Sequence, residues 1–202
     1  MRKVIQVLSN LISAVTNAPM CSTAFNAVDI SELCHGTQHI KLSTDLILWY
    51  SEAAPIQFEI PWFSEKLTLY NPTELITLQD GFRWPVSSEG DVDRDCLEAG
   101  WMDSWIVIGD VCGDPIIADV NKKGTPLYIA PHGIGSWNLE LLASCLDSFF
   151  AALAKWITVC LKKHHYQLFD EDSNVLQSIE NELEIELANT IGKESLSKWL
   201  NL

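Results

Sequence analysis

Three short apolar runs, joined by connections too short for a crossover, constrain this fold more than any other feature. The runs lie at residues 105–108, 116–120 and 127–129. Each is rich in β-branched or other large apolar residues, which favour strands. Residues 121–124 (Asn-Lys-Lys-Gly) are typical of a hairpin turn, with glycine where positive φ is needed. Because parallel strands need a crossover of a dozen or more residues, the segment predicts an antiparallel meander.

Strand and helix periodicities surround this meander. Alternation of polar and apolar residues predicts two further strands, at 57–60 and 67–70. Apolar residues at helical spacing predict a first helix over residues 3–16 and a long helix over about 138–163. The chain is therefore predicted to form a sheet whose strands have one helix before them and one after them in the sequence.

Other segments carry weaker signals. Ser43 or Thr44 is placed to cap a helix that ends before Pro55. Residues 21–42 fit neither period, and residues 79–100 are irregular enough to predict a long surface excursion.

These elements predict an α+β fold. A chain of 202 residues with 48% hydrophobic residues is long enough for one well-filled domain, so a single domain over residues 1–202 is expected. The predicted architecture is an antiparallel sheet of five or six strands packed against helices. Helical segments are expected at the N-terminus and in a C-terminal extension over residues 166–202.

The net charge of the chain argues against two classes of binding partner. The chain has 13 basic and 27 acidic residues, a net charge of −14. This argues against direct binding of nucleic acid and against an anionic membrane surface, both of which need Lys and Arg. No stretch approaches 18 uninterrupted apolar residues, so no membrane span is expected. The six cysteines form no C-x-x-C pair and are interpreted as reduced, in a cytoplasmic protein.

No group of residues matches a catalytic or metal-binding pattern. Cys34, His35 and His39 have only loosely zinc-like spacing, and a structural site needs a fourth ligand. The carboxylates within residues 110–119 do not fit a calcium loop and are predicted to accept hydrogen bonds from turn amides. His132 is interpreted as a hydrogen-bonded loop residue, because no nucleophile pattern accompanies it. The chain is predicted to be no enzyme and to hold no cofactor or metal; a hydrolase using His132 is the enzymatic alternative.

An acidic window is the strongest candidate for a binding surface. Residues 89–119 contain nine carboxylates and one basic residue, with tryptophans interspersed. Carboxylates with aromatic anchors suit a partner that has a Lys/Arg-rich groove. The alternative is a solvated surface above buried tryptophans. The predicted protein-binding residues are Trp84, Glu89, Asp91, Asp93, Asp95, Glu98, Trp101 and Asp103.

The meander also carries a family resemblance. A strand is followed by Gly109-Asp110, and Gly113-Asp114-Pro115 leads into the next strand. A Pro-x-Tyr strand, a His-Gly loop with a tryptophan, and a helix with paired phenylalanines follow. The residues concerned are Pro126, Tyr128, His132, Gly133, Trp137, Phe149 and Phe150. This order resembles the SUKH superfamily over about residues 40–153, and the helix from Leu42 to Tyr50 resembles one of its helices.

The resemblance implies an α+β fold and a non-catalytic binding role. Bacterial members of the family are immunity proteins that neutralise a cognate polymorphic toxin, often a nuclease, and fungal members regulate cell-wall assembly. The expected function is therefore an immunity protein that occludes the active site of a basic protein toxin. The alternative is a regulatory or scaffold protein that binds an endogenous partner. Monomer and homodimer both remain open, since the last helix could pack against a second copy.

Overall fold

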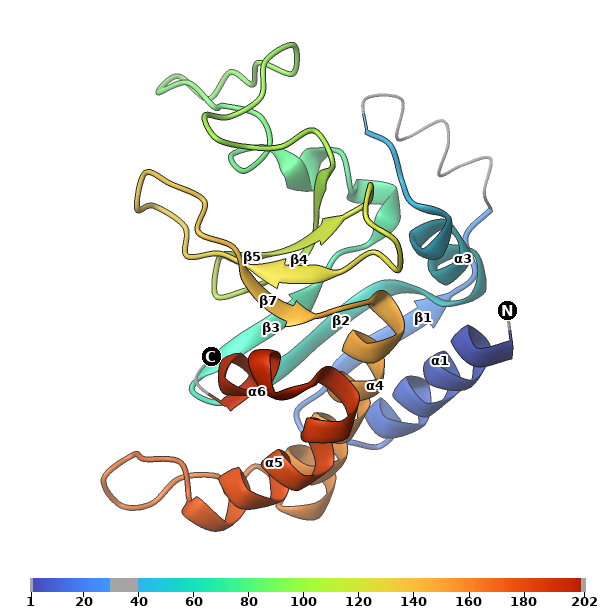
Figure 1. Ribbon diagram of the computed structural model, residues 1–202, viewed down its shortest axis with the longest axis vertical. Helices are drawn as coiled ribbons and strands as arrows, with labels where there is room; N and C mark the ends of the chain where they lie inside the picture. Colours follow the sequence, from blue (N-terminus) through green and yellow to red (C-terminus); the bar gives the residue numbers. More distant parts are fainter. Residues whose placement is uncertain (1, 30–39, 201–202) are drawn as a thin grey trace.

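In the part of the chain that the structure describes, seven strands form one antiparallel sheet, and each strand pairs with its neighbour in sequence (Figure 1). The computed structural model describes residues 2–29 and 40–200. The strand order β1 to β7 is a continuous meander, and the short connections between β2 and β3 and from β4 to β6 allow only antiparallel pairing there. The bounds are β1 Ser22–Asn26, β2 Ala54–Trp62, β3 Glu65–Leu69, β4 Trp105–Val111, β5 Asp114–Asp119, β6 Leu127–Ile129 and β7 Glu140–Ala143.

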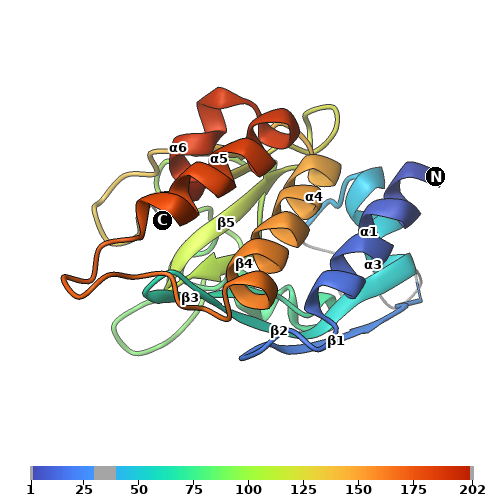
Figure 2. The same cartoon turned by 90° about the horizontal axis from the view of Figure 1, so that it is seen from below.

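Helices cover one face of this sheet (Figure 2). α4 lies between α1 and α5, and α6 packs on β7. The predicted cap at Ser43 is confirmed: its Oγ accepts a hydrogen bond from Leu46 N at 3.1 Å and starts α3. The bounds are α1 Arg2–Val15, α3 Thr44–Ala53, the 3₁₀ turns η1 Pro72–Glu74 and η2 Thr77–Gln79, α4 Leu146–Trp156, the π-helix η3 Ile157–Lys163, α5 Gln177–Ile191 and α6 Lys193–Leu200.

The core between helices and sheet contains a cluster of tryptophans. Trp62 of β2 stacks on Trp156 of α4 with ring centroids 4.3 Å apart, and Trp199 of α6 meets Trp62 at 5.2 Å. All three side chains are buried. Trp199 Nε1 donates to the carbonyl of Leu142 in β7 at 2.9 Å, whereas Trp156 Nε1 has no acceptor in the described chain. The cluster joins elements far apart in sequence, so α6 belongs to the same core.

The predicted α+β class and antiparallel pairing are confirmed, but the sheet has more strands than expected. β1 lies within residues 21–42, which no periodicity assigned. β7 lies within residues 138–163, so the helix prediction is wrong at its start, and α4 begins only after Cys145. The run Leu141-Leu142-Ala143 lacks alternating polar residues, and a short apolar run does not distinguish strand from helix.

The C-terminal extension packs against α4. Ile179, Leu183 and Leu187 of α5 are buried within the chain. These are the apolar residues with which the last helix could pack against a second copy, and the chain's own core covers them. Ile185, on the other side of the helix, is exposed.

One carboxylate of α5 bridges two basic side chains at the end of η3. Glu182 Oε1 lies 2.6 Å from Lys163 Nζ, and Glu182 Oε2 lies 2.9 Å from His164 Nε2. The hydrogen bond from Lys163, and then that from His164, lower the pKa of Glu182 below its ordinary value. Because the folded-state pKa is depressed, the ionised carboxylate stabilises the fold above its unfolded pKa. That contribution is lost as the pH falls through the folded pKa.

Replacement of Glu182 by glutamine is therefore expected to destabilise the fold at neutral pH by about 1 kcal/mol or less, because the pair is partly exposed. The difference from wild type should shrink between neutral pH and an acidic pH below the depressed folded-state pKa, where the carboxylate is protonated in both states. Urea unfolding at the two pH values measures it. Glu184→Gln removes an exposed carboxylate of the same helix and serves as the matched control. A Glu182→Gln difference that is equal at both pH values would contradict the linkage.

Candidate functional site

A long irregular segment between η2 and β4 forms the acidic excursion, defined as residues 80–104. Figure 1 shows it in green, projecting beyond one end of the sheet. Its backbone carries its own hydrogen bonds, such as Ser87 N to Asp91 O at 2.8 Å and Asp93 N to Pro85 O at 3.1 Å. The surface excursion predicted from the sequence is confirmed, and its hydrogen bonds give it a defined shape.

Gln79 fixes the start of the excursion to the sheet. β3 ends at Leu69, opposite Gly109, so the backbone of Val107 has no β3 residue beside it. The buried amide of Gln79 takes that place: Nε2 donates to Val107 O at 2.8 Å, and Oε1 accepts from Val107 N at 2.9 Å. One side chain thus continues the pairing of β4 where the neighbouring strand has ended.

Arg83 fixes the end of the excursion. Its side chain is buried, and Nη1 donates to the carbonyls of Asp103 at 2.9 Å and Trp105 at 3.3 Å. Nη2 donates to Asp103 Oδ1 at 2.5 Å. The second arginine of the excursion, Arg94, makes a bidentate pair with Asp80 at 3.2 and 2.6 Å. Both guanidinium groups lie 5.5 Å from the Trp84 ring, so the two pairs and this ring hold the segment together.

The two tryptophans of the predicted binding surface are buried. Trp84 is 2% exposed and Trp101 is 5% exposed. Trp101 also donates from Nε1 to Trp105 O at 3.1 Å. Their predicted role as anchors that contact a partner is corrected, because neither ring reaches the surface. They support the excursion from beneath, as the alternative interpretation of the window predicted.

The carboxylates of the predicted surface divide into two groups. Asp103 is exposed but pairs with Arg83. The others make no ion pair with any basic side chain in the described residues, and all but the half-buried Glu98 are exposed; they are Glu89, Asp91, Asp93, Asp95 and Glu98. Both arginines of the excursion are already paired. Five carboxylates thus remain available to a basic partner.

Apolar side chains that the sequence analysis did not identify lie among these carboxylates. Val86 is 45% exposed, Leu97 39% and Met102 55%. Single exposed apolar residues are ordinary on protein surfaces. Three of them on one acidic segment provide exposed apolar surface, which the buried tryptophans do not.

A cleft of about 400 Å³ separates the excursion from the His132 loop, defined as residues 130–139. Phe82 and Glu98 line it from the excursion, and His132 and Trp137 from the loop. His132 is held by Asp114, whose Oδ1 accepts from His132 N at 2.9 Å and lies 2.6 Å from Nδ1. Among the described residues, no hydroxyl or thiol hydrogen-bonds to this ring. The geometry is that of a hydrogen-bonded loop histidine, as predicted.

The neighbouring turn also follows its prediction. Asp110 Oδ1 accepts a hydrogen bond from Gly113 N at 3.0 Å. Gly113 has φ +96°, and a Cβ there would lie 3.1 Å from the His132 ring. Glycine therefore permits both the turn and the close approach of the histidine.

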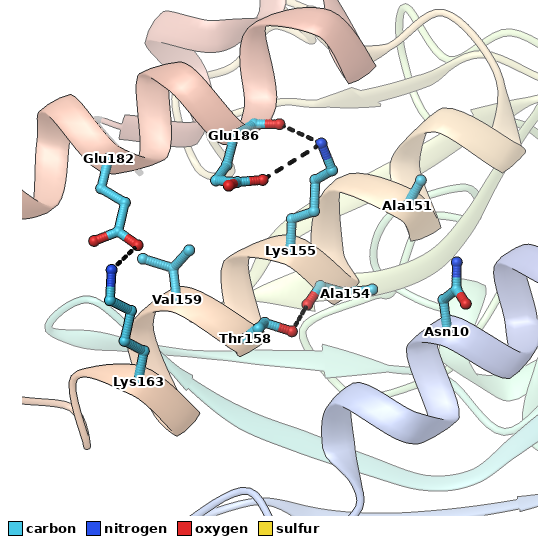
Figure 3. Close-up of a pocket in the computed structure, with 9 residues that line it drawn as sticks. All are labelled: Asn10, Ala151, Ala154, Lys155, Thr158, Val159, Lys163, Glu182 and Glu186. Carbon is cyan, nitrogen blue, oxygen red and sulfur yellow. Dashed lines mark hydrogen bonds and ion pairs between the residues drawn. The ribbon is translucent and has the colours of Figure 1, made fainter.

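A second hollow, of about 410 Å³, lies on the helical face between α1 and α5 (Figure 3). Ala151 and Ala154 of α4 line it, and Figure 3 shows two lysines directed toward α5. Lys155 Nζ donates to the backbone carbonyl of Glu186 at 2.5 Å and lies 3.7 Å from its carboxylate. Lys163 pairs with Glu182. The charges of this hollow are matched within the chain, so it selects for a charged partner less than the excursion does.

Comparison with protein-family models, curated proteins and solved structures finds no match. The resemblance carried by residues 105–120 therefore stays a prediction from the residues themselves.

Three further properties of the described residues concern metal ligands, membrane-spanning helices and cysteines. They contain no group of three or more His, Cys, Asp or Glu side chains placed to hold a metal ion. None of the helices among them has the length and apolar character to cross a bilayer. Their five cysteines are free. The candidate ligands Cys34, His35 and His39 lie outside this part of the chain.

Proposed function

We propose that this chain is a non-catalytic cytoplasmic protein that neutralises a basic protein toxin by covering the toxin's active site with the acidic excursion. The observation that carries the proposal is a hydrogen-bonded excursion with five carboxylates that have no basic partner among the described residues. Such a surface complements a groove lined with Lys and Arg, which nucleases use to bind phosphates. The resemblance to SUKH immunity proteins supports a toxin as the partner.

Charge and apolar contact have different roles in this proposal. A field of unpaired carboxylates raises the association rate by about 10- to 1,000-fold. Exposed ion pairs add only about 0–1 kcal/mol each. Affinity therefore depends on apolar contacts, and Val86, Leu97 and Met102 are the exposed side chains of the excursion that provide them. A standard interface buries about 1,600 Å² in total, so residues around the excursion contribute as well.

The direct test is co-purification with the protein encoded by the adjacent gene. The expected result is a stable complex, survival of cells that co-express both proteins, and weaker association at higher salt. Absence of binding and of protection at every salt concentration would reject the proposal. Capture of a housekeeping protein in place of a toxin would instead favour the regulatory or scaffold role.

A charge-neutral variant tests the assigned surface. Asp91→Asn, Asp93→Asn and Asp95→Asn together should slow association by about tenfold or more, since steering depends on the local field. The matched control carries Glu171→Gln, Asp172→Asn and Glu184→Gln, exposed residues of the C-terminal region, and changes the net charge equally. Stopped-flow association at low salt measures both. Equal slowing in the two variants would show that net charge matters and the excursion does not.

A further inference from the structure

The cleft between the excursion and the His132 loop combines a carboxylate with aromatic rings, and we infer that it receives one arginine side chain of the basic partner. The inference deepens the proposed function and rests on it for the partner's identity. Three features of the cleft carry it: fixed ring surfaces, a carboxylate without a cation, and the surrounding field.

The aromatic walls are partly exposed and well supported. Phe82 and Trp137 both line the cleft and are half-buried, with ring centroids 6.4 Å apart and planes at 62°. The buried Trp101 supports Trp137 with an edge-to-face contact at 4.8 Å. Rings fixed in this way offer apolar surface at a small cost in side-chain entropy. A planar guanidinium stacks on such surfaces better than an ammonium group does.

The carboxylate of the cleft is Glu98, and its backbone is fixed on both sides. Its N donates to Arg83 O at 2.8 Å, and its carbonyl accepts from Trp101 N at 2.9 Å. In the side chain, Oε1 accepts a 3.2 Å hydrogen bond from Ala99 N. No basic side chain of the described chain pairs with Glu98. The arginines of the excursion are held by Asp103 and Asp80, so neither supplies a cation for Glu98.

The charge around the cleft selects a cation over an anion. On the opposite wall, Asp114 places a second carboxylate within hydrogen-bond distance of the His132 ring. The exposed carboxylates of the excursion extend the same sign of charge across the neighbouring surface. An anion in the cleft would be repelled by the carboxylate of Glu98. The guanidinium of arginine satisfies both the carboxylate and the rings, because it forms charge-assisted hydrogen bonds in its plane and stacks through its faces.

The test uses the full chain and a small probe, N-acetyl-arginine methylamide, with the neutral citrulline analogue as the matched ligand. Binding is followed by NMR shifts of the tryptophan indole N–H groups. Glu98→Gln should weaken arginine binding by about tenfold or more, because a charge-assisted hydrogen bond is lost. Glu171→Gln, which removes an exposed carboxylate of the C-terminal region, is the matched protein control. It should change binding by about twofold or less.

The two proposals fail separately. Equal effects of Glu98→Gln and Glu171→Gln, or citrulline binding as tight as arginine binding, would overturn the arginine site and leave toxin neutralisation standing. Arginine binding that depends on Glu98, in a chain that captures no basic protein, would leave the cleft standing and remove the proposed function. Phe82→Leu should also weaken arginine binding. Its urea midpoint shows whether that loss reflects the cleft or the fold.

Discussion

Replacement of Trp156 by alanine is expected to lower the free energy of unfolding by about 3–5 kcal/mol, the range found for truncating large buried aromatic residues. Trp156 stacks on Trp62 and makes an edge-to-face contact with Phe63 at 5.6 Å. Truncation removes both contacts and leaves a cavity where α4 meets β2. A domain of this kind has about 5–15 kcal/mol of stability in total, so the variant should approach the limit of folding. Urea unfolding followed by circular dichroism measures the loss.

Phenylalanine at position 156 distinguishes the contribution of aromatic packing from that of the indole N–H. Trp156→Phe keeps an aromatic surface against Trp62 and removes a buried N–H that has no acceptor in the described chain. An unsatisfied buried donor costs about 1–3 kcal/mol, so its removal offsets part of the lost packing. Trp199→Phe instead breaks the bond to Leu142 O and should cost more than Trp156→Phe. The reverse order, or a loss below about 1 kcal/mol for Trp156→Ala, would contradict this account of the core.

The meander could be predicted because its information is local. Connections between β4, β5 and β6 are too short for any pairing but antiparallel, and their residues favour strands. β1 and β7 could not be predicted in the same way. β1 is polar and sits at the edge of the sheet, and Glu140–Ala143 of β7 shows no clean alternation. Their assignment depends on pairing with β2 and β6, which periodicity within a short window does not reveal.

The candidate site was likewise predictable only where its signal is local in the sequence. Charge is a property of the sequence, so the acidic character of this segment could be predicted from the sequence alone. The side chains that hold the segment in place were not identified. Gln79 contacts a residue 28 positions away, and Arg83 contacts residues 20 and 22 positions away. Glutamine or arginine in an irregular segment gives no local signal of such contacts.

The tryptophans show most clearly that the sequence does not determine which side chains are buried. A tryptophan among carboxylates fits an exposed anchor and a buried support equally well in sequence. Only the packing of Trp101 against Trp105 and Trp137 decides between them. The exposed apolar residues could have been noticed, since Met102 and Leu97 stand directly beside carboxylates in a segment without periodicity.

Arg83 provides the most informative single substitution in the excursion. Arg83→Met is expected to lower the free energy of unfolding by about 2–4 kcal/mol, since hydrogen bonds to charged groups are worth about 1.5–3 kcal/mol each. The substitution removes the donors for Asp103 O and Trp105 O from a buried position. Trp105 O keeps the bond from Trp101 Nε1, so the carbonyl of Asp103 loses more. Methionine keeps most of the apolar contact with Trp84.

Arg94→Met is the matched control, because it makes the same change of charge at a residue in contact with the same tryptophan ring. Its pair with Asp80 is partly exposed, so the expected loss is about 0–1 kcal/mol. Hydrogen exchange adds a readout that global stability does not give. Amides of the excursion, such as that of Glu98, should lose protection in Arg83→Met while those of α4 keep theirs. Uniform loss across the sheet and helices would mean that Arg83 supports the whole core. Loss confined to residues 80–104 would mean that a single buried guanidinium sets the shape of the excursion.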